Sequence, residues 1–405
     1  MSNASAATAE TSAAPHARFA LLALAVGAFG IGTTEFSPMG LLPQIASGVD
    51  VSIPTAGLLV SAYAVGVMIG APVMTLAFGR FGKRTALMLL MTIFTVGNIM
   101  SAMAPGYYTL LLARLVTSLN HGAFFGLGSI VAASLVSREK RAGAVATMFM
   151  GLTIANVGGV PAATWVGQQV GWRMAFAGTA VLGLVAIAAL FFALPRSKAG
   201  SRPEIRRELA VLTRSNVVLA LLTTVTGAAA MFTLYTYASA ALATLAGASG
   251  GFITLCLVLV GVGFTIGNWA GGRLSAWSLD GATMVFLVML AVVMFILPFA
   301  LQNQITAAIG LLLWGIAAFA IVPPVQTRVM HAAEEAPALA SSINIGAFNL
   351  GNAVGAAVGA GVIGAGLGYA ALPAAGGVLA IIGLCLVWLG RSSEQPALEE
   401  ASCKA

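Results

Sequence analysis

Long apolar stretches alternate with short polar segments along the whole chain. About 20 consecutive apolar residues are enough for a helix to cross a bilayer. The stretches lack the alternating apolar and polar residues of membrane barrel strands. The pattern therefore predicts an all-α membrane protein with twelve transmembrane helices. Their approximate limits are 19–42, 55–78, 85–104, 107–136, 142–166, 173–194, 216–243, 251–275, 282–301, 305–329, 338–363 and 371–390.

Composition supports a lipid environment for these helices. Only 8% of the 405 residues are charged, whereas soluble domains carry about 25%. The chain also has 48 glycines, and small residues let membrane helices approach closely. The spacing of its three cysteines suggests neither a metal site nor a disulfide framework.

The basic residues predict the orientation of the helices. If the N-terminus is cytoplasmic, all but two of the 19 basic residues lie in the tails, the central linker or the cytoplasmic loops. The exceptions are Arg173, outside, and Arg114, within a helix. Because Lys and Arg favour cytoplasmic loops, both termini are expected in the cytoplasm.

A weak internal repeat divides the chain. Gly66 and Gly70 recur as Gly263 and Gly267 at corresponding places. This predicts two pseudo-symmetric six-helix bundles, an arrangement typical of secondary transporters. The expected parts are a disordered cytoplasmic tail (1–17), an N-terminal bundle (18–194), a cytoplasmic linker (195–215), a C-terminal bundle (216–390) and a cytoplasmic tail (391–405).

Glu35 is the one acidic residue of the 12 that lies inside an apolar stretch. A carboxyl group in hydrocarbon is costly unless it is protonated or paired, so it indicates a functional site by default. The hypothesis is that Glu35 carries a proton coupled to transport. The alternative is a structural hydrogen bond to a neighbouring helix.

Arg114 and His121 are the other ionisable residues expected within the hydrocarbon. Counting about 1.5 Å of rise per residue puts Glu35 and Arg114 at a similar depth. They are therefore expected to face each other in at least one transport state. His121 lies two turns from Arg114 on the same helix face and could relay a proton. A structural ion pair for Arg114 and a hydrogen bond to a helix carbonyl for His121 are the alternatives.

Neutral polar residues are the candidates for substrate binding. Amides and aromatic rings suit a neutral or amphipathic ligand, although hydrogen bonds between helices are an alternative for each residue. The substrate-binding candidates are Asn120, Asn156, Tyr235, Asn268, Trp269, Asn344 and Asn349.

Glycines around Pro161 allow close packing, and Pro161 itself bends its helix by removing a hydrogen bond.

Several short motifs resemble those of the major facilitator superfamily. The loop from Gly79 to Arg84 is similar to a family loop that helps to close the cytoplasmic gate, but Gly79 stands where the family has an acid. The resemblance makes Arg80, Lys83 and Arg84 gating candidates, with a topological anchor as the alternative. The sequence around Arg114 resembles a helix-four motif of proton-coupled members. The run that ends at Pro161 resembles the antiporter signature, which makes Pro161 a further gating candidate, with packing alone as the alternative.

Further runs, including Gly-Thr-Thr-Glu-Phe around Glu35, resemble the twelve-helix drug:proton antiporters that export drugs or sugars. The resemblance implies a location in a bacterial inner membrane and proton-coupled efflux of a small organic solute by a monomer, with protons and lipid as the other partners. It implies neither an enzyme nor a cofactor, and no nucleic-acid partner. Uptake by symport or facilitated diffusion, and a sensor that binds without transport, are the alternatives.

Overall fold

The computed structural model describes residues 3–78, 80–137, 141–195, 213–275, 277–333 and 337–403. Within these ranges, side chains are described from residue 17 to residue 390, except at 141, 142, 337–339 and 342. The regular elements of the described residues are helices, and they form twelve segments that are long and apolar enough to span a membrane. This confirms the predicted fold class. The limits of the spans agree closely with those predicted from the apolar pattern. The largest difference is in the seventh span, which was predicted to end at 243 and ends at Tyr235.

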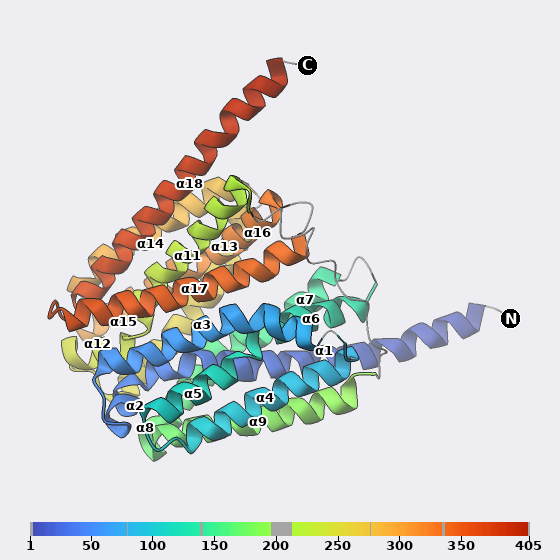
Figure 1. Ribbon diagram of the computed structural model, residues 1–405, viewed down its shortest axis with the longest axis horizontal. Coiled ribbons are helices and arrows are strands. Elements are labelled where there is room, and N and C mark those ends of the chain that lie inside the picture. The colour runs from blue at the N-terminus through green and yellow to red at the C-terminus, as the bar shows by residue number, and fades with distance from the viewer. Residues whose placement is uncertain are drawn as a thin grey trace. The chain divides into compact units, whose positions relative to one another are not determined.

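The helices of the first half of the chain begin with α1, which is already helical at Asn3 (Figure 1). The backbone is thus helical within the segment predicted to be a disordered tail, whose many alanines favour a helix. The bounds are α1 (Asn3–Gly40), α2 (Leu42–Gly48), α3 (Ile53–Phe78), α4 (Lys83–Ala102), α5 (Tyr107–Ser118), α6 (His121–Ser134), α7 (Arg141–Ile154), the π-helix η2 (Ala155–Gly159), α8 (Val160–Val170) and α9 (Trp172–Ala193).

The helices of the second half follow the linker, and the last of them, α18, extends into the segment predicted as a tail. The bounds are α11 (Ser215–Tyr235), α12 (Ala238–Leu245), α13 (Gly250–Ser275), α14 (Leu279–Ala300), α15 (Gln304–Ala320), α16 (Val322–Ala332), α17 (Pro337–Gly364) and α18 (Ala371–Cys403).

The chain forms two compact units, and the segment Pro38–Met68 groups with the second unit. The first consists of Met1–Ser37 and Ile69–Arg202, the second of Pro38–Met68 and Pro203–Ala405. Ser239 donates a hydrogen bond to the Met39 carbonyl at 2.6 Å, and Ser61 donates to the Ala353 carbonyl at 3.1 Å. These bonds tie Pro38–Met68 to its own unit, whereas the sequence placed this segment in the N-terminal bundle.

Glycines bring the helices of each unit close together. In the first unit, a Cβ on Gly151 of α7 would collide with the Ala25 carbonyl of α1. In the second, Gly351 and Gly355 of α17 leave no room for a Cβ beside α11, and the two helices run side by side (Figure 1). These glycines form a small-residue face of α17 that lets the two helices pack closely.

Prolines account for two interruptions of the spans. Pro161 is the second residue of α8, directly after the π-helical turn η2. Pro323 and Pro324 open α16, which is separated from α15 at Ile321. Because proline donates no backbone hydrogen bond, the helical ladder cannot continue unbroken through these positions. The interruption at Pro161 agrees with the bend expected from the sequence.

Candidate functional site

Glu35 is buried on α1 in the first unit, with only 4% of its surface exposed. Its Oε2 lies 3.9 Å from Nε2 of His121, the first residue of α6. The His121 ring also packs against Phe125, with 5.2 Å between the ring centroids. An acid and an imidazole thus lie near each other inside an apolar core, at a separation longer than a hydrogen bond.

Arg114 of α5 is even more deeply buried, with 1% exposure. Its Nη1 donates a hydrogen bond of 2.9 Å to the backbone carbonyl of Thr34, the residue before Glu35. The guanidinium lies 5.9 Å from the centre of the Phe176 ring. It also acts electrostatically on Glu35 and His121. The structure therefore gathers the three ionisable residues that the sequence singled out in one buried cluster.

The fourth span is not the continuous helix that the sequence predicted. It is interrupted at Leu119 and Asn120, so Arg114 and His121 belong to different helices. Before the break, Thr117 bonds back to the Ala113 carbonyl, and Thr117 also packs against Gly97 of α4. Hydroxyls that bond to their own helix tend to bend it. The two residues still reach one cluster, but not along one uninterrupted helix face.

Asn98 on α4 is a site residue that the sequence reasoning missed. It is fully buried, and its Oδ1 accepts a hydrogen bond of 2.6 Å from Thr34. The Thr179 hydroxyl of α9 lies 2.9 Å from the same oxygen. Asn98 thereby joins three helices next to the carbonyl that Arg114 binds. An amide within an apolar stretch is the signal that could have identified it.

Asn120 and Asn156 are both buried in the first unit. Asn120 lies at the start of α6, where its Nδ2 is 3.9 Å from the Met91 sulfur. Asn156 lies in η2 and donates to the Leu152 carbonyl at 3.0 Å. The side-chain oxygen of each has no hydrogen-bond partner among the described residues. These buried acceptors are free to receive a hydrogen bond from a ligand or from water.

Tyr235 belongs to an aromatic cluster in the second unit. Its ring centroid lies 5.5 Å from that of Phe264 on α13 and 5.7 Å from that of Trp314 on α15. Trp314 is fully buried, and its indole N–H has no hydrogen-bond partner among the described residues. The cluster offers ring faces and a donor, which suit an apolar or aromatic group.

Asn344 and Asn349 have different surroundings on α17. Asn344 accepts a hydrogen bond of 2.7 Å from Thr224 and donates one of 2.6 Å to Gln326, so both ends of its amide are occupied. Asn349 donates to the Ile345 carbonyl at 2.9 Å, but its oxygen has no partner in the described structure. Asn352, one turn further, is buried with both amide atoms unpartnered there. The geometry makes Asn344 an interhelical contact and leaves Asn349 and Asn352 open to a ligand.

The remaining substrate candidates, Asn268 and Trp269 of α13, are exposed, Trp269 by 66%. They are not part of the buried aromatic cluster. Trp314 and Asn352 are buried alternatives in the same unit that the site prediction did not include.

The three basic gating candidates lie at the start of α4 and in the loop before it, whereas Pro161 lies in α8. Arg80 is exposed, with its guanidinium 5.1 Å from the centre of the Phe81 ring. Lys83 is the first residue of α4. The Arg84 guanidinium lies 4.4 Å from the centre of the Phe191 ring on α9. Gly79, which occupies the acidic position of the family motif, lies outside the described residues.

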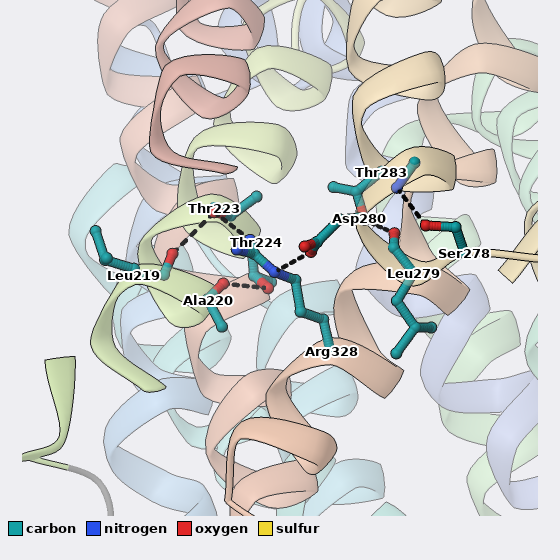
Figure 2. A network of polar contacts seen from close by, with 10 residues as sticks. Leu219, Ala220, Thr223, Thr224, Ser278, Leu279, Asp280, Thr283 and Arg328 are labelled. Atoms are coloured by element: carbon teal, nitrogen blue, oxygen red, sulfur yellow. Dashed lines mark hydrogen bonds and ion pairs between the residues drawn. The ribbon is translucent and has the colours of Figure 1, made fainter. Parts of the chain in front are cut away.

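An ion pair in the second unit was not anticipated from the sequence. Arg328 of α16 reaches Asp280 in the first turn of α14, with 2.9 Å between Nε and Oδ1 (Figure 2). Its Nη1 also lies 3.3 Å from the Thr223 hydroxyl of α11. The pair therefore ties the short helix α16 to two neighbouring helices. The signal in the sequence was an acid two residues after Ser278, which caps α14.

Comparisons with known proteins agree with this architecture. A family model described as Major Facilitator Superfamily matches residues 24–356. The chain is 61% identical to the inner membrane transport protein YdhP of Escherichia coli K12, covering 93% of this chain and 97% of that protein. It is 32% identical to a chloramphenicol resistance protein of Streptomyces lividans, covering 85% and 89% of the two chains.

Among solved structures, a D-xylose-proton symporter superimposes with a TM-score of 0.74. The superposition covers 91% of this chain and 96% of the symporter, at 18% identity, and so shows a shared fold. The family model and the identity to the Escherichia coli transporter together show more than the fold. The chain belongs to the major facilitator superfamily of membrane transporters.

Proposed function

We propose that the protein exports a small organic solute across the inner membrane in exchange for protons, acting as a monomer. The observation that carries this proposal is the buried cluster of Glu35, His121 and Arg114. The name of the Streptomyces relative, a chloramphenicol resistance protein, supports export over uptake.

The cluster provides the proton-binding step. A carboxylate in hydrocarbon is stable only when it is protonated or compensated by a cation. A change in water access, or in the distance between Glu35 and Arg114, therefore changes how readily Glu35 binds a proton. His121, 3.9 Å away, is placed to receive or deliver that proton.

The solute is bound by neutral polar and aromatic groups. The first unit offers the unpartnered oxygens of Asn120 and Asn156 as hydrogen-bond acceptors. The second unit, taken by itself, offers the rings of Tyr235 and Trp314 for an apolar group and the unpartnered oxygen of Asn349 for a polar one. This set lacks charged residues, which favours a neutral or amphipathic solute.

The test is the transport activity of Glu35→Gln in proteoliposomes with an imposed pH gradient, with chloramphenicol as the first probe. We expect gradient-driven transport to be lost while exchange without a gradient persists. Asp50→Asn is the matched control, because Asp50 is an exposed acid whose backbone φ of 54° asparagine tolerates. Full gradient-driven transport by Glu35→Gln would refute the proposed role. Reversing the gradient distinguishes export from uptake.

We further propose that both termini and the central linker are cytoplasmic, as the distribution of Lys and Arg indicates. Reporter fusions at Arg196 and after Arg391 should report the cytoplasm, and one at Gly171 should report the periplasm. The reverse pattern would overturn the orientation without affecting the proposed chemistry.

A further inference from the structure

Pro38 lies four residues after Thr34 within α1, which continues to Gly40. In an α-helix the carbonyl of one residue accepts a hydrogen bond from the N–H four residues later. Proline has no N–H, so Pro38 cannot give the Thr34 carbonyl this bond. The sequence therefore frees one particular oxygen on the helix that carries Glu35.

Arg114 uses that oxygen. Its Nη1 donates to the Thr34 carbonyl at 2.9 Å, and both residues are buried, with 1% and 0% exposure. A carbonyl without a partner in such a place would lose free energy comparable to a missing hydrogen bond. The guanidinium supplies the missing donor and is charged, which makes the bond stronger than a neutral one.

We infer that Pro38 is a positioning residue for Arg114, because it reserves the Thr34 carbonyl for the guanidinium. The inference rests on the proposed role of Glu35 in proton coupling. A backbone carbonyl stays neutral whether or not Glu35 carries a proton. The bond therefore holds the cation beside Glu35 throughout the proton cycle, whereas a bond to the carboxylate alone would weaken on protonation.

Pro38→Ala tests the inference because the new N–H can take the Thr34 carbonyl from Arg114. Thermal unfolding midpoints are measured in detergent for Pro38→Ala, Arg114→Gln and the double variant. If Pro38 acts through Arg114, Arg114→Gln lowers the midpoint less in the Pro38→Ala background than in the natural chain. The deviation from additivity between the two substitutions should correspond to a change of about twofold or more in the unfolding equilibrium constant. This exceeds the deviation found for substitutions at sites that do not interact.

Pro72→Ala, combined with the same Arg114 change, is the matched control, since Pro72 also lies inside a spanning helix. We expect its effect to add to that of Arg114→Gln. Additive effects for Pro38→Ala as well would overturn the inference and leave Pro38 only as a bend in α1.

A transport measurement separates positioning from bending. Pro38→Ala should move fewer protons per solute molecule while solute affinity stays unchanged, because the cation is displaced and the binding groups are not. An unchanged proton ratio would also overturn the inference. Failure of the proposed function would be recognised by a different result, full gradient-driven transport by Glu35→Gln. The stability measurements on Pro38 and Arg114 would remain valid in that case.

Discussion

The two halves of the chain share a packing scaffold but not its chemistry. Gly70 of α3 packs against Leu119, and Gly267 of α13 packs against Ile316. Because 197 residues separate both the two glycines and their two partners, the same helix contact occurs twice. At the same spacing from Arg114 and His121, the second half has Leu311 and Ala318, both buried. The two halves therefore share this helix contact, whereas the buried ionisable cluster of Glu35, Arg114 and His121 belongs to the first half.

The second half has aromatic residues and helix-end charges instead. Trp314 stands 197 residues after Thr117 and joins the rings of Tyr235 and Phe264. The ion pair described in the second half joins Asp280 and Arg328 near the ends of their helices. Their side chains are 26% and 13% exposed. Buried ionisable groups in the first half are suited to binding protons, whereas the rings of the second are suited to binding an uncharged surface.

The largest expected effect comes from placing the first half's cation in the second. Leu311→Arg buries a charge at a position with 1% exposure and no acid in the corresponding place on α11. We expect a loss of about 3 kcal/mol of stability, the scale for arginine at the centre of a spanning helix. Thermal unfolding in detergent measures it, with Leu311→Met as the volume-conserving control. Equal midpoints for the two variants would mean that the second half can compensate a buried cation.

The spans could be predicted from sequence because a long apolar run is a local property. The interruptions were harder, since no proline marks the break at Leu119 and Asn120. The interruption at Pro161 could be anticipated from the proline alone. Local sequence therefore predicts a break that proline imposes and misses one without such a residue.

The site was predicted in part for the same reason. Rare residue types in hydrocarbon identified Glu35, Arg114 and His121 as candidates without knowledge of their contacts. Asn98 was missed because its importance depends on hydroxyls from two other helices. The bond from Arg114 to the Thr34 carbonyl needed both the helical register of Pro38 and the tertiary packing of α5.

A smaller effect tests the shared scaffold. A Cβ on Gly267 would collide with the Ile316 carbonyl, whereas one on Gly70 would lie 3.0 Å from a Leu119 methyl carbon. We expect Gly267→Ala to lower stability by about 1–3 kcal/mol through overpacking, and Gly70→Ala by less. Gly272→Ala on the same helix is the control, because nothing lies within 4 Å of the place its Cβ would take. A harmless Gly267→Ala would contradict the tight packing of α13 on α15.

The ion pair of the second half should contribute less than the buried cluster of the first. Asp280→Asn removes the charge opposite Arg328, and partial exposure of both groups limits the loss to about 1 kcal/mol. The loss should shrink at high salt, which screens exposed charges. Thermal midpoints at low and high salt measure both effects, with Arg273→Gln, an exposed basic residue, as the control. A salt-independent loss would indicate a role in packing rather than charge.

The smallest effect concerns a hydrogen bond that each half makes in a similar way. Thr34 donates to Asn98 at 2.6 Å, and Thr224 donates to Asn344 at 2.7 Å. Thr34→Val and Thr224→Val should each reduce stability by about 0.6 kcal/mol, the average for hydrogen bonds within membranes. Thr92→Val on the exposed side of α4 is the control, since its hydroxyl bonds to its own helix. Thr34→Val also keeps the backbone carbonyl that binds Arg114, so gradient-driven transport should persist. Loss of that transport, as severe as in Glu35→Gln, would instead place the Thr34 hydroxyl on the proton path.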